Sequence, residues 1–208
     1  VILKLYETYG TKSFSMLDGM FCFTILDLKK DKTYLVRDFF GEKPLYYFSH
    51  RNKIIWASEL KSIISVLNKK PEICKEALAL YFRLTYIPTP YSIYKGIKKL
   101  KHGNYIKIDN KTLKLTTKNY KKEKDFEIVD ITFDEAKRET FRLVNESVRS
   151  RLVSDVPVGT FLSGGVDSSI VSLCHSLNSN TKIDTFSASF TNNKFDESKK
   201  AKKVSNLI

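Results

Sequence analysis

Residues 161–169 read Phe-Leu-Ser-Gly-Gly-Val-Asp-Ser-Ser, and this stretch decides how the C-terminal part of the chain folds. The apolar segment 158–162 predicts a buried strand, and segment 168–177 has the spacing of an amphipathic helix. After a polar break, segment 183–190 predicts a second strand. A helix that joins two strands predicts a parallel, right-handed βαβ unit. The apolar positions that we expect this helix to bury are Ile170, Leu173, Cys174 and Leu177.

The turn Ser163-Gly164-Gly165 lies where open α/β sheets bind ligands, beyond the carboxyl end of a strand. A helix N-terminus there offers unpaired N–H groups and a partial positive charge. Glycines let the backbone approach an anion closely. Together with the N–H groups of residues 166–169, this turn therefore predicts a phosphate cradle.

Side chains of the same stretch add to this prediction. The hydroxyls of Ser163, Ser168 and Ser169 can donate to phosphate oxygens. Asp167 would repel a phosphate unless a divalent cation bridged the two, so Asp167 is a candidate Mg²⁺ ligand. A Walker A loop is excluded because it needs a lysine, and a G-x-S-x-G hydrolase elbow is excluded because the order differs. The alternative without a ligand is an N-capped helix after a glycine turn.

Composition narrows the class of protein. The 208 residues are 42% hydrophobic, which suits a packed core, and no apolar run is long enough to span a bilayer. The three distant cysteines, at 22, 74 and 174, predict free buried thiols in a cytosolic protein. The net charge of +13 comes from scattered lysines, which predicts a solvated surface suited to an anionic small-molecule substrate. The chain has no initiator Met and both ends lie inside helix-like patterns, so we expect a piece of a longer protein.

The N-terminal half is rich in predicted strands. We expect strands at 19–27, 33–38, 45–48, 54–57, 104–109 and 113–115. Helices are expected at 59–67, with Ser58 as N-cap, and at 75–84.

A charged, non-periodic stretch at 117–131 predicts a linker between a domain at 1–116 and a second at 132–208. Thr132 and Glu135 match a capping box at the start of a helix that runs to about Leu152. Residues 195–204 predict a last helix that carries basic residues.

Several stretches resemble one enzyme family. The S-G-G-x-D-S-S segment resembles the PP-loop of the ATP pyrophosphatase superfamily, and "RLVSDVPVGTFLSGGVDSSIV" (151–171) resembles the start of the synthetase domain of glutamine-dependent asparagine synthetases. Three stretches resemble the latter half of that family's glutaminase domain: "LDGMFCFTILD" (17–27), "RDFFGEKPLYY" (37–47) and "WASELKSI" (56–63). "YIPTPYSIYKGIKKLKHG" (86–103) resembles the family's connector.

The resemblance implies an α/β fold, α+β overall. Residues 1–116 would be the C-terminal part of a glutaminase domain of the N-terminal-nucleophile (Ntn) hydrolase class, an α-β-β-α sandwich. Residues 132–208 would begin a parallel α/β domain of the PP-loop class, like the adenine nucleotide α-hydrolases. The implied reaction is ATP-dependent amidation of aspartate through β-aspartyl-AMP, with ammonia from glutamine and release of AMP and pyrophosphate. ATP and Mg²⁺ are the implied cofactors. The resemblance implies a cytoplasmic protein that binds neither membranes nor nucleic acid. The full-length protein would be a homodimer.

The resemblance also implies roles for residues. The implied ATP and pyrophosphate contacts are Leu162, Ser163, Gly164, Gly165, Val166, Asp167, Ser168, Ser169 and Ala188. The family's glutaminase nucleophile is an N-terminal cysteine that this chain lacks, and Cys22 is no substitute, so we expect the chain alone not to hydrolyse glutamine. Three alternatives stay open: an amidotransferase that acts on another carboxylate, such as that of a sugar; a PP-loop module that modifies RNA; and a scaffold protein without catalytic activity.

Overall fold

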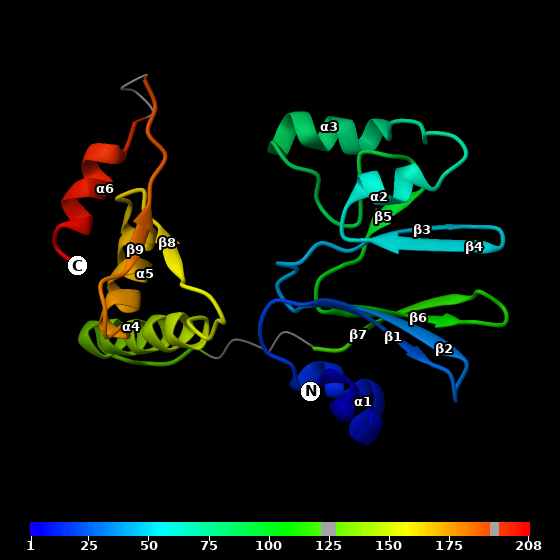
Figure 1. The fold of residues 1–208 in the computed structure, drawn as a ribbon, viewed down its shortest axis with the longest axis horizontal. Coiled ribbons are helices and arrows are strands. Elements are labelled where there is room, and N and C mark those ends of the chain that lie inside the picture. The colour runs from blue at the N-terminus through cyan, green and yellow to red at the C-terminus, as the bar shows by residue number, and fades with distance from the viewer. Residues whose placement is uncertain (122–127, 192–195) are drawn as a thin grey trace. The chain divides into compact units, whose positions relative to one another are not determined.

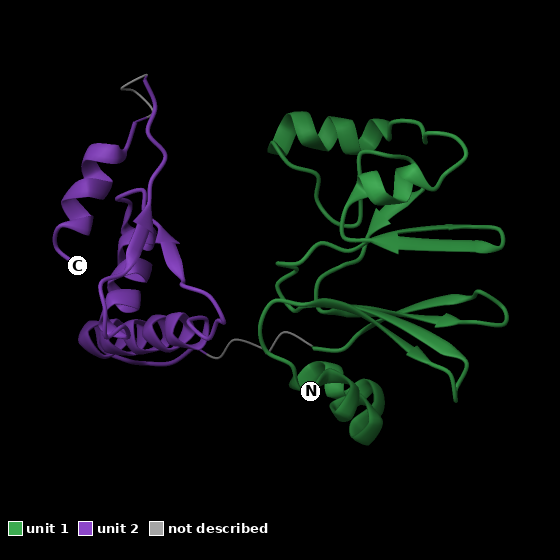
Figure 2. Ribbon diagram, viewed as in Figure 1, with its two compact units in different colours: residues 1–125 green, residues 126–208 purple. Residues whose placement is uncertain are grey.

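The computed structural model describes residues 1–121, 128–191 and 196–208, which form two compact units, Val1–Asp125 and Phe126–Ile208 (Figure 2). Both units mix helices and sheets (Figure 1). Residues 122–127 of the expected linker, and 195 of the expected last helix, lie outside the described residues.

Unit 1 contains two antiparallel sheets. The first has the order β1 (Cys22–Asp27), β2 (Lys32–Arg37), β6 (Asn104–Asp109), β7 (Leu115–Asn119), and the second β4 (Lys53–Ala57), β3 (Tyr46–His50), β5 (Ile97–Lys99). Its helices are α1 (Ile2–Tyr9), the 3₁₀ helix η1 (Gly10–Met16), α2 (Leu60–Ser65) and α3 (Lys75–Leu84). Within this unit, α2 and α3 lie on the outer side of the second sheet and α1 on the outer side of the first (Figure 1).

Strand β2 is buried on both faces because its side chains alternate between two cores. Leu35 contacts a core that includes Leu45 and Ile106, to which Tyr47 and Ile54 of the second sheet add, so this core joins the two sheets. The opposite face has a second core.

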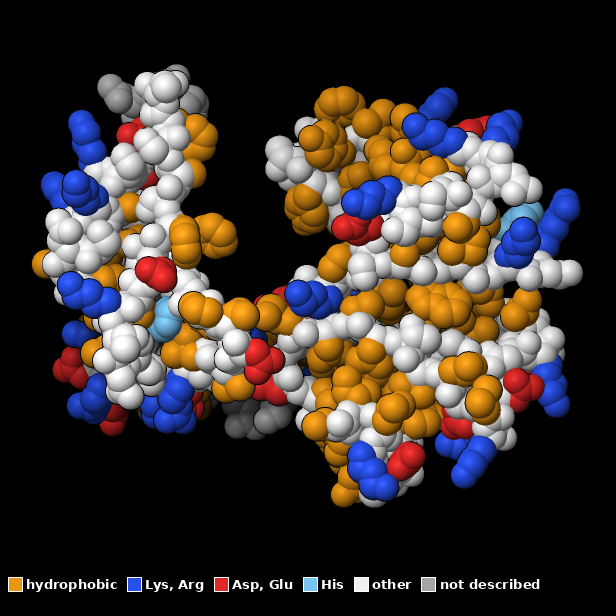
Figure 3. Space-filling view, viewed as in Figure 1, with side chains coloured by type: hydrophobic (Ala, Val, Ile, Leu, Met, Phe, Trp, Pro, Cys, Tyr) orange, Lys and Arg blue, Asp and Glu red, His pale blue; other side chains and the backbone are white. Residues whose placement is uncertain are grey.

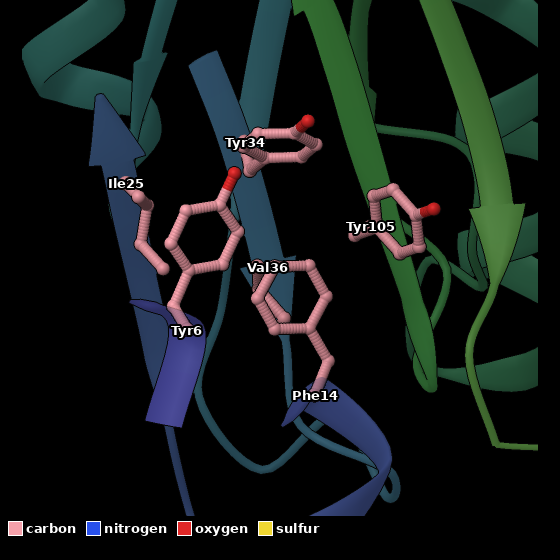
Figure 4. Close-up of a cluster of buried hydrophobic side chains, with 6 residues drawn as sticks. All are labelled: Tyr6, Phe14, Ile25, Tyr34, Val36 and Tyr105. Carbon is pink, nitrogen blue, oxygen red and sulfur yellow. The ribbon is translucent and has the colours of Figure 1, made fainter. Parts of the chain in front are cut away.

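The second core joins the first sheet to the N-terminal helices (Figure 4). Phe14 of η1 is fully buried, and its ring centroid lies 5.2 Å from that of Tyr105 and 6.1 Å from that of Tyr34. Tyr6 of α1 stacks on Phe14 at 6.1 Å and donates a hydrogen bond of 2.8 Å to the Asp27 carboxylate. Aromatic side chains therefore hold the helices to the sheet.

The end of β2 organises the turn that follows. The buried Arg37 guanidinium donates to the carbonyl oxygens of Lys43 (2.8 Å), Gly41 (2.6 Å) and Leu100 (2.6 Å). The Asp38 carboxylate, also buried, accepts from the backbone N–H groups of Glu42 and Lys43, each at 2.9 Å. These five bonds satisfy buried charges with backbone groups.

Unit 2 contains the predicted parallel unit. Its elements are α4 (Phe133–Ser150), β8 (Gly159–Phe161), α5 (Val166–Leu177), β9 (Asp184–Phe186) and α6 (Ser198–Ser205). Strands β8 and β9 pair in parallel, with Phe161 opposite Phe186, which confirms that part of the prediction. The capping box at the start of α4 is also confirmed, since Glu135 N–H donates to the Thr132 hydroxyl at 3.3 Å and Thr132 N–H donates to the Glu135 carboxylate at 2.8 Å.

The predicted burial in unit 2 is largely wrong. Of the four α5 side chains expected inside, only Cys174 is buried; Ile170, Leu173 and Leu177 are exposed. Strand β8 is not a buried strand either, because Phe161 is 87% exposed. A two-stranded sheet covers only a narrow stripe of a helix, so apolar side chains stay on the surface of the described part of this unit (Figure 3).

Smaller predictions also need correction. The N-cap of α2 is Glu59, whose backbone is extended and whose side chain makes no capping bond, and not Ser58. The last strand of the first sheet is Leu115–Asn119 rather than 113–115, and both η1 and β5 lacked a predicted counterpart. All three cysteines are free, but Cys22, which packs at the margin of a core, and Cys74, the N-cap of α3, are only partly buried.

Candidate functional site

The glycine turn joins the carboxyl end of β8 to the first turn of α5, as the sequence predicts. Gly164 has φ +80°, a conformation that favours glycine, whereas Gly165 has φ −75° and ψ 164° and is the N-cap of α5. A Cβ atom on Gly164 would lie 2.6 Å from Lys200 Cβ and 2.7 Å from Ala201 N, both in α6. Gly164 is therefore needed for its backbone angle and for the close approach of α6.

The three serine hydroxyls make hydrogen bonds within the turn. The Ser163 and Ser168 hydroxyl oxygens lie 3.0 Å apart, and the Ser168 hydroxyl also lies 3.2 Å from the Gly165 carbonyl oxygen. The Ser169 hydroxyl donates to the same carbonyl oxygen at 2.7 Å. When the Ser168 hydroxyl donates to the Ser163 oxygen, the Ser163 proton is available, so Ser163 is the hydroxyl best placed to donate to a ligand.

Backbone N–H groups provide the remaining donors. The first hydrogen bond of α5 runs from Ser169 N–H to the Gly165 carbonyl oxygen at 3.0 Å. Ahead of it, the N–H groups of Val166, Asp167 and Ser168 donate to no acceptor among the residues that the structure describes. These donors at a helix N-terminus suit an anion.

Asp167 is exposed in the first turn of α5 and has no hydrogen bond or ion pair within the described ranges. The described residues also contain no group of three or more His, Cys, Asp or Glu side chains that could hold a metal ion. One carboxylate fits Mg²⁺ bound mainly by substrate phosphates, because Mg²⁺ commonly takes one or two carboxylates plus phosphate oxygens. The residues present therefore fit a cation that arrives on a nucleotide.

A cavity of about 310 Å³ opens beside the turn, at the carboxyl ends of β8 and β9. Leu162 lines it and is 1% exposed; its N–H donates to the Phe186 carbonyl oxygen at 2.8 Å and its carbonyl oxygen accepts from the Ser187 hydroxyl at 2.5 Å. Ala188 also lines the cavity and is exposed rather than packed in the core. The other lining residues are Phe161, Ser163, Ser168, Phe186, Ser187, Phe190 and Glu197.

The structure thus brings Leu162 and Ala188 to one cavity together with Ser163 and Ser168, whereas Asp167 does not line it. Sequence reasoning gave no site role to the aromatic residues of this cavity or to Glu197. Phe161, Phe186 and Phe190 lie within the predicted strands, whereas Glu197 follows the second strand on its carboxyl side, where ligands bind.

Helix α6 begins next to the same turn. The Asp196 carboxylate accepts from the Ser198 hydroxyl at 2.9 Å and from its N–H at 3.1 Å, and these bonds lower the pKa of Asp196. Lysine side chains lie along α6, at positions 199, 200, 202 and 203, and basic side chains are visible on the surface of unit 2 (Figure 3). Positive charge therefore lies on the element that contacts Gly164.

Cys22 lies inside β1, opposite Arg37 of β2, and burial raises the pKa of its thiol. A protonated thiol in a strand is a poor nucleophile. No helix in the described part of the chain is both long and apolar enough to cross a membrane.

Comparisons with known proteins match two successive parts of the chain to two protein families. The glutamine amidotransferase domain family matches residues 1–121, and the asparagine synthase family matches residues 139–208. The chain is 40% identical over 202 residues to "Putative asparagine synthetase (glutamine-hydrolyzing) 2" of Methanocaldococcus jannaschii, covering 95% of this chain and 38% of that protein. It is 37% identical over 205 residues to asparagine synthetase (glutamine-hydrolyzing) 1 of Bacillus subtilis, covering 98% of this chain and 32% of that protein.

The chain spans about a third of the length of these two relatives. The amidotransferase match alone covers more than half of the chain, and the asparagine synthase match follows it along the chain. The chain therefore belongs to the glutamine-dependent asparagine synthetase family.

Proposed function

We propose that this chain is part of an enzyme that amidates aspartate at the expense of ATP, with ammonia from glutamine. The reaction would proceed through β-aspartyl-AMP and release AMP and pyrophosphate. The observation that carries the proposal is the turn 163–165, whose helix N-terminus offers N–H groups with no acceptor among the described residues, beside a cavity lined by Leu162 and Ala188. The names of the relatives support the acceptor and the nitrogen donor.

In this proposal, different residues of the turn and of the cavity contact different parts of the nucleotide. The N–H groups of Val166, Asp167 and Ser168 and the Ser163 hydroxyl bind the phosphates that leave as pyrophosphate. Mg²⁺, when bound, would neutralise charge on the leaving group, and Asp167 is the residue of this chain that would hold it. Leu162 and Ala188 contact the nucleoside side of the ligand. Glycines 164 and 165 let the backbone reach the phosphates.

We assign unit 1 to the Ntn-hydrolase class and unit 2 to the PP-loop class. The helices outside two stacked antiparallel sheets support the first assignment, and the glycine turn between a parallel strand and a helix supports the second. The proposed domains are residues 1–116 and 132–208, with 117–131 as the linker. A cytoplasmic, homodimeric full-length enzyme completes the proposal.

The test uses the purified full-length product of the gene with Mg²⁺, ATP and labelled pyrophosphate. We expect aspartate to be required for exchange of pyrophosphate into ATP, and glutamine to yield asparagine in the complete reaction. Pyrophosphate exchange with a sugar carboxylate but not with aspartate would show that the enzyme acts on an acceptor other than aspartate. No exchange with any carboxylate, under conditions in which ATP binds, would refute the proposed ligase.

A further inference from the structure

Glu197 is the one acidic residue among those that line the cavity beside the glycine turn in the described part of the chain. It is exposed, it lines the cavity, and its side chain makes no hydrogen bond or ion pair with any residue in the described ranges. A charged group that faces a cavity without a protein partner is a candidate contact for a ligand.

The backbone of α6 fixes where this carboxylate stands. The Glu197 carbonyl oxygen accepts from the N–H groups of Lys200 and Ala201, each at 3.0 Å, in the first turn of α6. The same two residues contact the backbone of Gly164, and Ala201 is 2% exposed. Glu197 is therefore held one helical turn away from the residues that touch the glycine turn.

Both apolar and polar residues line the cavity. Phe186, Phe190 and Ala188 provide apolar surface, whereas Ser163 and Ser168 belong to the phosphate-binding turn. A nucleotide that places its base against the apolar residues and its phosphates at the turn must place its sugar between them. Aromatic side chains are common partners of flat bases, which favours this orientation.

An ionised carboxylate only accepts hydrogen bonds, so its partner must be a donor. Phosphate is excluded as a direct partner because the charges repel. The other acid of the turn, Asp167, does not line this cavity, whereas Glu197 does. Sugar hydroxyls are the neutral donors of the middle part of a nucleotide, and an acidic side chain that accepts from ribose is a recurring solution in nucleotide-binding α/β sheets.

We propose that Glu197 accepts hydrogen bonds from the ribose hydroxyls of the bound nucleotide and thereby selects ATP over 2′-deoxy-ATP. This inference rests on the proposed function, since it assumes that the cavity takes ATP. Glu197 is then a specificity-determining residue, and it takes no part in bond making or breaking.

The test compares kcat/KM for ATP and for 2′-deoxy-ATP in aspartate-dependent pyrophosphate exchange by the full-length protein. We expect the wild type to prefer ATP by about tenfold or more, because a charged acceptor loses a hydrogen bond in the deoxy complex. Glu197→Ala should bring the ratio close to one, and Glu197→Gln should give an intermediate value. Asp155→Ala, which removes an exposed acid of unit 2 outside the cavity, should leave the ratio unchanged.

The ratio is independent of the fraction of folded enzyme, so a poorly folding variant remains informative. A wild type that uses both nucleotides equally would overturn the inference while leaving the proposed function intact. A Glu197→Ala enzyme that keeps the wild-type ratio of kcat/KM for ATP and 2′-deoxy-ATP would also overturn the inference. The same holds for a Glu197→Ala enzyme that keeps this ratio but loses its preference for ATP over GTP, because Glu197 would then contact the base. Absence of exchange with either nucleotide in the wild type would instead count against the proposed function.

Discussion

Replacement of Gly164 by alanine tests the contact between the glycine turn and α6. At φ +80° an alanine adopts a left-handed conformation, which costs about 1–2 kcal/mol. The new Cβ would lie 2.6–2.7 Å from Cβ and C of Lys200 and from N of Ala201, whereas favourable carbon contacts lie at about 3.5–4.0 Å. Helix α6 must therefore move by about 1 Å, and such overpacking typically costs about 1–3 kcal/mol.

The two contributions predict a loss of about 2–5 kcal/mol in the stability of unit 2. Gly165→Ala is a matched control, because its φ of −75° is ordinary and the nearest atom to a new Cβ is the Ser163 hydroxyl oxygen at 3.4 Å. For this control we expect a smaller loss, about 1 kcal/mol, since alanine is a poorer N-cap than glycine but meets neither a strained backbone angle nor the packing of α6.

Urea unfolding of the full-length variants measures both losses, and hydrogen exchange of α6 peptides locates the effect. We expect faster exchange in α6 and a higher KM for ATP in Gly164→Ala than in Gly165→Ala. If the two variants are equally stable and their α6 peptides exchange equally slowly, then the packing of α6 on Gly164 is wrong.

Three further predictions concern other parts of the chain. Phe14→Ala should destabilise unit 1 by about 3–5 kcal/mol in urea unfolding, because it empties the centre of an aromatic core; a loss below about 1 kcal/mol would contradict that packing. Hydrogen bonds from the Lys30 N–H and the Tyr6 hydroxyl lower the pKa of Asp27, so its stabilising effect is present above about pH 4 and is lost as pH falls through the lower folded pKa. Tyr6→Phe should make stability less sensitive to acid in that range, and an unchanged pH profile of unfolding would refute this. Asp167→Asn should abolish aspartate-dependent pyrophosphate exchange while glutamate release from glutamine remains measurable, and exchange at the wild-type rate would exclude Asp167 as a Mg²⁺ ligand.

Features that depend on neighbouring residues could be predicted from the sequence. The capping box of Thr132 and Glu135 is present because both partners lie within one turn of the chain. Helix α3 begins at Lys75 and ends at Leu84, as its periodicity predicts. The parallel pairing of β8 with β9 also follows from local order, because a helix lies between them.

Features that depend on distant segments could not be predicted. The exposure of Ile170 and Leu177 depends on how much sheet covers α5, which periodicity does not reveal. The internal hydrogen bonds of Ser169 depend on the exact start of α5, two residues before the expected position. The place of Glu197 at the cavity depends on the packing of α6 against Gly164, which no local pattern encodes.

The bonds of Arg37 and Asp38 have a practical consequence for loop engineering. The side chains of Arg37 and Asp38 hydrogen-bond to backbone groups of Gly41, Glu42 and Lys43 in the turn after β2. These bonds fix the number of residues that the turn can contain. One added residue would separate these groups from both side chains, so the buried Asp38 carboxylate would lose these partners and the buried Arg37 guanidinium would keep its bond to the Leu100 carbonyl oxygen. An epitope or fluorophore tag inserted there should abolish soluble expression, whereas the β3–β4 hairpin turn at 51–52, which lacks such clamps among the described residues, is the better insertion point.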